Sequence, residues 1–406
     1  MHYAVPRLLH HAGRLGHLYT DICAVKGWPR ALRLLPPPFR PARLRRLLGR
    51  DPVGVPAALI TAFTSFGHDY ARRLVRAASP TEFTATLIWA GRTFCEKIIA
   101  AGLGHAASVY AFNNAALELL RHARALGRFT VLEQTIAPKQ IECEWMNGER
   151  EEFPDWESTP QPDRLLDRFI ERQAAEWEAA DVILCGSEFV RAGIVRCGGP
   201  AHRCRVVPYG VDSSFCPTAR APHHGPLRVL TVGVVGLRKG SPYVLAAARQ
   251  LRSRAIFRMV GGIQAGDGAQ SQLRNVVELI GPVPRSEVLK HFQWADVLLL
   301  PSLCEGSATA TYEALACGLP VIATPNAGTV VRDGVEGFIV AARNVEGIVR
   351  SLERLINDRD RLRQMSENAR RRSDEFNFRA YQKNLLAALQ PDRSAPMKKE
   401  WPVCAH

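Results

Sequence analysis

Two carboxylates, Glu305 and Glu313, lie eight positions apart within the run 301–323. Carboxylate oxygens accept hydrogen bonds from hydroxyl groups, so a pair placed beside a phosphate site suits a ribose and a hexose. Exposed helical glutamates are common, and the simplest alternative for such a pair is a solvated helix face. The elements predicted around the two residues favour the first interpretation.

These elements are a strand, a turn and a helix. The apolar run 296–300 predicts a buried parallel strand, and the small residues 302–307 predict a turn that opens a helix ending at Gly318. Glu305 would lie in the turn and Glu313 about two turns inside the helix. Unpaired N–H groups and the dipole at a helix start favour a diphosphate. The run therefore predicts a nucleotide-sugar site.

A second group of residues carries positive charge. The predicted strand 227–234 leads into a turn that contains Gly236, then Arg238 and Lys239, and ends at Gly240. When a sugar leaves a nucleoside diphosphate, negative charge builds on the leaving phosphate, and fixed cations with helix N–H groups can stabilise it without a metal. The alternative is a pair of solvated loop charges.

These motifs resemble those of the retaining glycosyltransferases of family 4, the glycosyl transferases group 1. The glutamate pair matches the Glu-x7-Glu signature of that family. The runs 180–191, 207–217 and 232–240 are similar to its last first-domain strand, its linker and its glycine turn. The resemblance covers about half the chain, residues 179–381, and implies a GT-B fold. That fold is an α/β architecture of two Rossmann-like, doubly wound parallel-sheet domains facing a crevice.

The resemblance also implies roles for the matching residues. Glu313 would hold the ribose hydroxyls of the donor, and Glu305 would contact hydroxyls of the transferred sugar. Backbone N–H groups of the turn after Glu305 would meet the phosphates. The predicted catalytic residues are Arg238, Lys239 and Glu305. The predicted donor-binding residues are Gly236, Gly261, Val283, Gly306, Ser307, Ala308 and Glu313.

Two positions depart from the family pattern. Val234 stands where members usually carry an arginine, and Arg238 could supply the guanidinium from the other end of the turn. Gln134 stands where many members place a histidine, which leaves Glu133 as a candidate for the first-domain group that contacts the donor sugar. The second departure leaves open which first-domain group contacts the donor sugar.

Apolar runs alternate with helical patterns along the whole chain, which is typical of parallel sheets covered on both faces. We predict an acceptor-side domain over 1–215, a nucleotide-sugar domain over 216–375, a helix crossing back over 376–389 and a disordered tail over 390–406. The expected strands are 107–111, 129–133, 182–186, 205–208, 227–234, 256–260, 277–280, 296–300, 321–324 and 337–340.

Three further expectations concern the first half. Helices are predicted from Asn113 or Asn114 to Arg124 and over 162–180, whereas the Glu-, Trp- and Pro-rich segment 141–160 is predicted to be a loop. Residues 1–17 appear helical in pattern where a doubly wound domain normally begins with a strand. The first strand is therefore expected to be absent or displaced.

Composition narrows the class of protein. At 406 residues with 47% hydrophobic content, the chain is expected to fold as two domains. It has no run of about 18 apolar residues and no evident secretion signal, which predicts a cytoplasmic protein. Ten cysteines without a Cys-x-x-Cys pair make zinc and disulfide frameworks improbable. The sole Asp-x-Asp, at 358–360, is interpreted as a helix cap and not as a metal site.

The net charge of +14 is unevenly distributed. Residues 1–51 hold ten Lys and Arg against Asp21 and Asp51, a net charge of +8. The segment 39–50 alternates arginines with leucines, so it could rest on an anionic membrane at its inner face, hold an anionic acceptor, or form an ordinary surface helix. No nucleic-acid-binding motif accompanies the charge, so no nucleic-acid partner is expected.

The sequence thus predicts a retaining, metal-independent, hexosyltransferase-like glycosyltransferase with no cofactor. A UDP- or GDP-sugar would be its donor substrate, and a glycan, lipid or small molecule its acceptor. The alternatives are a non-catalytic GT-B scaffold and a sugar-nucleotide epimerase. A dehydrogenase is disfavoured because no Gly-x-Gly-x-x-Gly opens a first strand-helix unit. The donor base, the sugar and the oligomeric state are not predicted.

Overall fold

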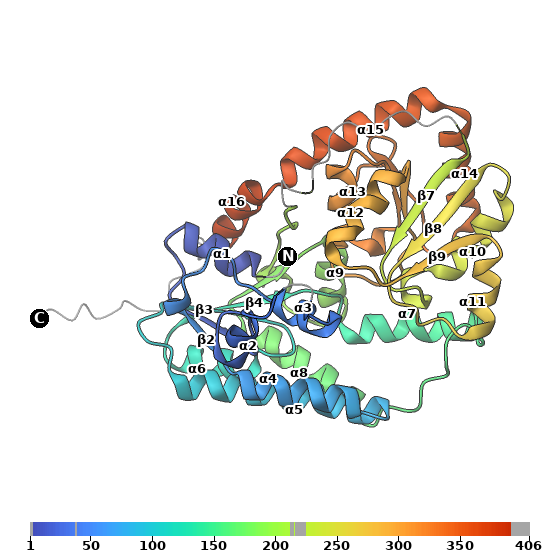
Figure 1. Ribbon diagram of the computed structural model, residues 1–406. Coiled ribbons are helices and arrows are strands. Elements are labelled where there is room, and N and C mark those ends of the chain that lie inside the picture. The colour runs from blue at the N-terminus through green and yellow to red at the C-terminus, as the bar shows by residue number, and fades with distance from the viewer. Residues whose placement is uncertain (1–2, 37–38, 212–214, 216–224, 391–406) are drawn as a thin grey trace, which may run out of the picture.

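The computed structural model describes residues 3–36, 39–211, 215 and 225–390. Two parallel sheets, each covered by helices, lie side by side (Figure 1). The last strand of the first sheet ends at Val206, and the first strand of the second begins at Leu227. The predicted boundary after residue 215 falls between them, although residues 212–214 and 216–224 lie outside the described part of the chain, as do residues 391–406 of the predicted tail 390–406.

The second sheet has six strands in the order β12-β11-β10-β7-β8-β9, all parallel. The order reverses between β7 and β10, and ligands of such sheets bind outside the carboxyl ends of the strands at this reversal. The strands are β7 (Leu227–Val232), β8 (Ala255–Val260), β9 (Val277–Gly281), β10 (Val297–Leu300), β11 (Val321–Ala323) and β12 (Gly337–Ile339). The helices are α10 (Ser241–Gln250), α11 (Asp267–Arg274), α12 (Arg285–Trp294), α13 (Thr309–Ala316), α14 (Val345–Asn357) and α15 (Arg359–Ser373).

The first sheet has four parallel strands in the sequential order β3-β4-β5-β6. Its strands are β3 (Ser108–Phe112), β4 (Phe129–Gln134), β5 (Val182–Cys185) and β6 (Cys204–Val206). Its helices include α1 (Ala4–His11), α2 (Gly27–Leu32), α3 (Ala42–Leu48), α4 (Thr64–Arg76), α5 (Pro80–Ala101), α6 (Leu117–Ala125), α7 (Lys139–Glu152), α8 (Leu166–Ala179) and α9 (Glu188–Arg196). Two short strands, β1 (Leu18–Thr20) and β2 (Ile60–Ala62), pair with each other outside this sheet.

The sequence located all ten strands of the two main sheets to within two residues at either end. The expectation of a displaced first strand is also met, because α1 opens the described chain and β1 pairs only with β2. The loop predicted over 141–160 is wrong, since α7 occupies most of it. Ile141, Met146 and Glu149 are buried on α7, and the many exposed polar residues between them concealed this face in the sequence.

Helix α7 belongs to the first half by sequence but packs against the second. Glu149 is fully buried on α7 and accepts hydrogen bonds from Tyr243 Oη at 2.9 and 2.8 Å and from Arg343 Nε at 2.6 Å. The aromatic ring of Phe153, directly after α7, packs edge-on against Tyr243. These contacts attach the first half to α10 and to the segment before α14.

The final helix α16 (Phe378–Ala388) runs back to the first half (Figure 1). Gln382 Nε2 donates to the Leu8 carbonyl of α1 at 2.7 Å, and the Tyr381 ring meets Tyr209 edge-on. Arg205 on β6 donates to the carbonyl of Ala388. No helix in the described ranges is both long and apolar enough to cross a membrane.

Burial of Glu176 makes stability depend on pH. The Glu176 carboxylate on α8 accepts N–H bonds from Asn114 at 2.8 Å and Ala116 at 3.1 Å, yet burial raises its pKa to about 7. The native state therefore binds this proton more tightly than the unfolded chain does. This stabilisation is full below the unfolded pKa of about 4.3 and is lost as pH rises through about 7.

We therefore expect Glu176→Gln to remove a pH dependence that the wild type shows. Between the unfolded and the native pKa, the free energy of unfolding of the wild type should fall relative to the variant by up to about 1.4 kcal/mol per pH unit. Urea unfolding at a series of pH values measures this difference. Parallel curves for the two proteins would contradict the prediction.

Candidate functional site

The turns after β7 and β8 meet backbone to backbone at the carboxyl edge of the second sheet. Gly233 and Gly261 have φ angles of +138° and +152°, and a Cβ on Gly261 would overlap the carbonyl of Gly233. A Cβ on Gly233 would lie 2.7 Å from Cε of Lys239, so the glycine leaves room for this side chain. The two glycines thus allow the lysine to reach back beneath the turn.

The three predicted catalytic residues come together at this turn. Lys239 Nζ lies 2.9 Å from Oε1 of Glu305, and a guanidinium nitrogen of Arg238 lies 3.0 Å from the same oxygen. The side chains of Lys239 and Glu305 are each only 11% exposed, whereas that of Arg238 is 30% exposed. We call this group the Lys239–Glu305–Arg238 cluster. Two cations and one carboxylate leave it with a net positive charge.

Glu305 was expected to contact sugar hydroxyls, and it is bound to the cations through one oxygen. Its Oε2 accepts no hydrogen bond from any residue within the described ranges. Arg238 also donates to the carbonyl of Cys304 at 3.1 Å, which holds the guanidinium against the turn before α13. One carboxylate oxygen therefore remains available while the other orients both cations.

The backbone of this turn differs in part from the prediction. The N–H of Ala308 donates to the carbonyl of Ala327 at 3.0 Å, so Ala308 is not the free donor that was expected. In the described part of the chain, the N–H groups of Gly306 and Ser307 have no hydrogen-bond acceptor. Helix α13 begins at Thr309, so Glu313 lies about one turn inside it and not two.

Gly306 is the point where the two halves of the chain touch at the site. A Cβ here would overlap the carbonyl of Thr135, which follows β4 of the first half. Ser187, at the start of α9, donates its hydroxyl to the Gly306 carbonyl. The Ser307 hydroxyl bonds Tyr312 Oη at 2.7 Å and the Gly328 carbonyl at 3.1 Å, so this hydroxyl is engaged in holding the turn.

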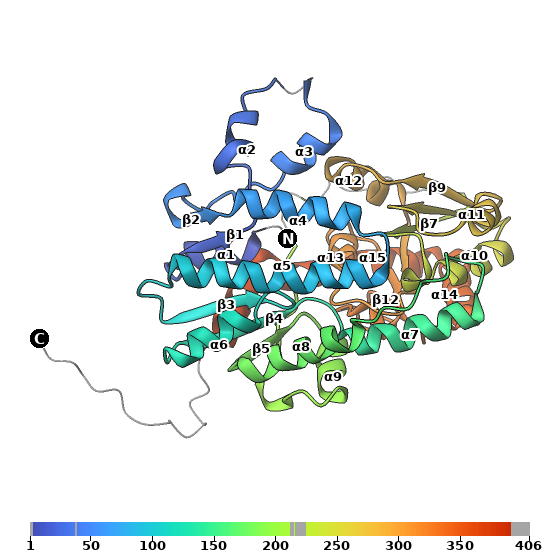
Figure 2. The same ribbon diagram turned by 90° about the horizontal axis from the view of Figure 1, so that it is seen from below.

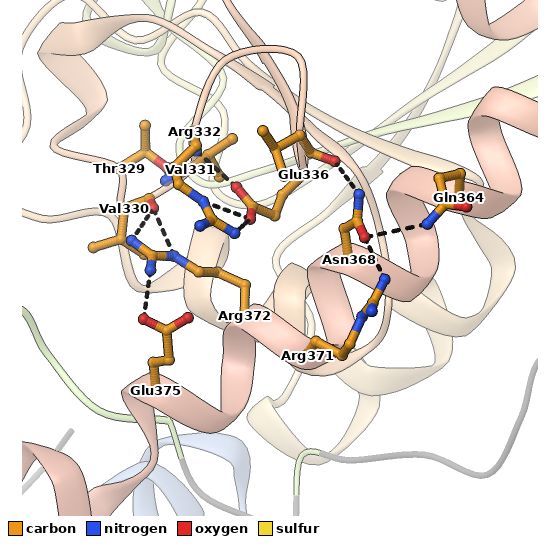
Figure 3. Close-up of polar contacts among 11 residues, drawn as sticks. Thr329, Val330, Val331, Arg332, Glu336, Gln364, Asn368, Arg371, Arg372 and Glu375 are labelled. Atoms are coloured by element: carbon orange, nitrogen blue, oxygen red, sulfur yellow. Dashed lines mark hydrogen bonds and ion pairs between the residues drawn. The ribbon is translucent and has the colours of Figure 1, made fainter.

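Gly328 precedes a loop that a polar network fixes to α15 (Figure 3). Arg332 pairs with the fully buried Glu336, whose carboxylate also accepts the N–H of Arg332 at 2.8 Å. From α15, Asn368 donates to the Val335 carbonyl at 3.0 Å, and Arg372 donates to the Val330 carbonyl. A fixed loop keeps the carbonyl of Gly328 in place for Ser307.

Glu313 is paired with a residue that sequence reasoning missed. Arg285, the first residue of α12, forms an ion pair with Glu313 and lies over the ring of Phe215 at 4.8 Å. The predicted Val283 lies two residues earlier and packs, half-buried, against the core. The signal for Arg285 was its place directly after Gly281-Pro282-Val283-Pro284, at a helix start. The Arg285 side chain is 63% exposed, so it can move away from Glu313.

A carboxylate from the first half covers the predicted Gly236. Glu157, in the segment after α7, accepts the N–H of Leu237 at 2.7 Å, and a Cβ on Gly236 would overlap the same carboxylate oxygen. Nearby, the Trp156 carbonyl accepts the N–H of Gly266 at 2.8 Å. The sequence offered no signal for Glu157, because its segment was predicted only as an irregular loop.

Glu133 lies at the end of β4 between two tyrosines. Tyr209 Oη donates to Oε1 at 3.0 Å, and Tyr110 Oη donates to Oε2. Burial raises the pKa of Glu133, although both hydrogen bonds lower it. Ser307 and Thr309 of the second half line the same cavity as Glu133. The structure thus brings this first-domain candidate to the predicted phosphate loop.

Among the described residues, no three His, Cys, Asp or Glu side chains gather in a group that could hold a metal ion. The Asp-x-Asp at 358–360 is a helix cap as predicted, since Asp358 accepts the N–H of Arg361 at 2.8 Å at the start of α15.

The second half of the chain is similar in sequence to known proteins. Residues 218–372 match the family model of the glycosyl transferases group 1. The D-inositol 3-phosphate glycosyltransferase of Thermobispora bispora is 32% identical over 209 residues, which are 45% of this chain and 49% of that protein. The amylovoran biosynthesis glycosyltransferase AmsK of Erwinia amylovora is 28% identical over 179 residues, 40% of this chain and 44% of that protein. The chain thus spans about half the length of these two relatives.

The fold has similar solved structures. Anabaena Alr3699/HepE in complex with UDP-glucose superposes with a TM-score of 0.58 at 15% identity, covering 91% of this chain and 98% of that one. The architecture is therefore GT-B, as predicted, with one departure from two doubly wound sheets: the strands of the first sheet follow one another in chain order, whereas the strand order of the second sheet reverses between β7 and β10. Within this fold, the match to the glycosyl transferases group 1 model lies in the second half.

The contact at Gly306 can be tested by adding one methyl group. We expect Gly306→Ala to lower the free energy of unfolding by about 1–3 kcal/mol, because the new Cβ must push the Thr135 carbonyl away. Gly268→Ala on α11 is the matched control, since nothing lies within 4 Å of a Cβ there. Urea unfolding of both variants provides the comparison, and equal stability would refute the close contact.

Proposed function

We propose that the chain is a retaining, metal-independent glycosyltransferase that moves a sugar from a nucleotide-sugar donor to an acceptor. The observation that carries the proposal is the Lys239–Glu305–Arg238 cluster beside the turn that opens α13. Two fixed cations and the N–H groups of Gly306 and Ser307 suit the charge that develops on a leaving diphosphate. Retention rests on the family resemblance.

Each site residue has a proposed task. Arg238 and Lys239 would contact the diphosphate, and Glu305 would keep both oriented while its second oxygen accepts a sugar hydroxyl. Glu313 would accept the ribose hydroxyls after Arg285 turns outward. Arg285 also lies over the ring of Phe215, so its guanidinium keeps a partner besides Glu313.

The first half would supply the acceptor side. We propose residues 1–215 as the acceptor-side domain, 216–375 as the nucleotide-sugar domain and 376–389 as the crossing helix, in a cytoplasmic protein. Glu133 is the proposed first-domain group nearest the transferred sugar. Val234 brings no guanidinium, so Arg238, held by Glu305 and the Cys304 carbonyl, would take that part.

The proposal predicts that one lysine matters and another does not. Lys239→Ala should weaken UDP or GDP binding at least about tenfold and lower donor turnover by about a hundredfold, because it removes a buried cation from the phosphate site. Lys290→Ala, which removes the same charge from the exposed face of α12, is the control. Calorimetry with UDP and GDP, followed by hydrolysis assays with a panel of their sugars, gives both quantities.

Glu313→Ala serves as the second variant and should lower nucleotide affinity with little change in turnover at saturation. Wild-type behaviour in both Lys239→Ala and Glu313→Ala would exclude the proposal. Binding without hydrolysis or transfer would favour a non-catalytic scaffold, and a free altered sugar would identify an epimerase. Proton NMR of the product reports the anomeric configuration, and EDTA should leave the rate unchanged.

We also propose that the α2–α3 projection, residues 27–36 and 39–48, contacts an anionic membrane. Helices α2 and α3 extend away from the rest of the first half (Figure 2). Trp28, Leu34, Leu35 and Phe39 are exposed here, Leu34 to 87% and Phe39 to 75%. Exposed arginines at 30, 33, 45 and 46 accompany them. Apolar side chains among arginines suit a surface of anionic lipids, where each cation contributes about 1 kcal/mol.

Sedimentation with vesicles of phosphatidylglycerol and phosphatidylcholine tests this contact. The wild type should bind at low salt and dissociate at high salt, and Leu34→Asp and Phe39→Asp should each weaken binding severalfold. Leu126→Asp is the control, because Leu126 is 52% exposed directly after α6, away from the projection. Equal binding of all variants, or none by the wild type, would refute the contact.

A further inference from the structure

The first half lines most of an open cavity of about 750 Å³ that the proposed function does not yet explain. Its walls come from α1, β1, α4 and α5 and from the ends of β3 and β4. A site for a drug-sized ligand typically has about 300–1,000 Å³, so the cavity is large enough for a substrate. It begins in the first half and ends at Ser307 and Thr309 of the second.

The wall formed by α4 and α5 is almost entirely apolar. Phe66, Leu87, Ala90 and Phe94 line it together with Tyr70, whose hydroxyl is a polar group on this wall, and Phe112 adds a further ring at the end of β3. Phe66 packs against Phe94 at 5.8 Å between ring centroids and against the neighbouring Trp89 at 5.6 Å. Such rings offer large apolar area and no hydrogen-bond acceptor. A hydroxyl-rich sugar placed against this wall would lose its water and gain few partners, at a cost of about 1–3 kcal/mol for each unpaired group.

One group of polar residues lies where the cavity meets the second half. Asn113 Oδ1 accepts from the Thr135 N–H at 3.0 Å and from the Thr135 hydroxyl at 2.9 Å. Glu133, held by its two tyrosines, lies on the same lining as Ser307 and Thr309. Thr135 also contacts Gly306 through its carbonyl. The polar end of the cavity therefore adjoins the loop proposed to hold the diphosphate.

The arginine that lines the cavity is already paired with an aspartate of the same lining. Arg50 pairs with Asp21, and its Nε donates to the Ile22 carbonyl at 3.0 Å. Asp21 and Arg50 also line the cavity, and Arg50 follows α3 directly, at the base of the α2–α3 projection. The cavity thus continues to the part of the molecule proposed to contact a membrane, and it offers no unpaired cation for an anionic ligand among its described lining residues.

We infer that the cavity holds the acceptor and that this acceptor is an amphiphilic alcohol, with a bulky apolar body against α4 and α5 and its hydroxyl toward Glu133. The inference rests on the proposed function, because an acceptor requires a donor in the neighbouring crevice. It excludes a wholly polar oligosaccharide from the cavity.

Binding of n-octyl β-D-glucoside, compared with methyl β-D-glucoside, tests the inference. Calorimetry below the micelle concentration should show binding of the octyl compound at least about tenfold tighter than that of the methyl compound. With the nucleotide sugar selected in the donor panel, only the octyl compound should be glycosylated at a measurable rate. UDP or GDP affinity, measured on the same preparation, reports the donor site separately.

Ala90→Trp, which fills the cavity from α5, should abolish octyl glucoside binding and leave nucleotide affinity unchanged. If this variant does not fold, Leu87→Phe reduces the same space from a half-buried position and should weaken binding severalfold. Phe83→Trp is the control, because Phe83 is exposed on α5 outside the cavity lining.

Equal affinity for the two glucosides, or octyl glucoside binding that Ala90→Trp and Leu87→Phe leave intact, would overturn the inference while nucleotide binding and donor hydrolysis still upheld the proposed function. Octyl glucoside binding in a protein that binds no nucleotide would overturn both the acceptor assignment and the proposed function.

Discussion

The whole arrangement depends on the pairing of Glu305 with two cations. Burying Lys239 without a counter-charge would cost several kcal/mol, and Glu305 provides that charge from a different strand-to-helix turn. The pairing also ties together the turns after β7 and β10, the two strands between which the sheet order reverses. Gly233 and Gly261 are needed because any side chain there would displace the lysine or the neighbouring backbone. The backbone geometry of the two glycine turns and the charge pairing therefore both depend on Lys239 having this position.

The second constraint is that the two halves of the chain meet at the turn that contains Gly306. Thr135, which follows β4, contacts Gly306, and Ser187 donates a hydrogen bond to the Gly306 carbonyl. Glu157 accepts the N–H of Leu237 in the turn after β7. Helix α7 adds a buried carboxylate, Glu149, to the second half. A site assembled in this way has geometry that depends on the distance between the sheets. Small movements of the halves would therefore change the orientation of several backbone donors at once.

Most of the fold and part of the site could be predicted from sequence. Strands buried on both faces are continuous apolar runs, so β3 to β12 were located, and glycine turns marked Gly233 to Gly240. Helix α7 was missed because its buried positions are separated by charged residues. Arg285 and Glu157 were missed because their partners lie 28 and 80 positions away, and single-sequence patterns contain no information on such pairs. Ala308 was misjudged because only the folded loop brings the Ala327 carbonyl to its N–H.

Helix α16 has a consequence for synthesis of the chain. It packs on α1 and on the end of β6, so a surface built from the first residues is covered by residues 378–388. Because a ribosome releases the chain from its N-terminus onward, this surface remains uncovered until the entire second half has been translated. Premature termination before α16 would leave Leu8 and its neighbours uncovered, and a truncated product would be recognisable to chaperones by that patch.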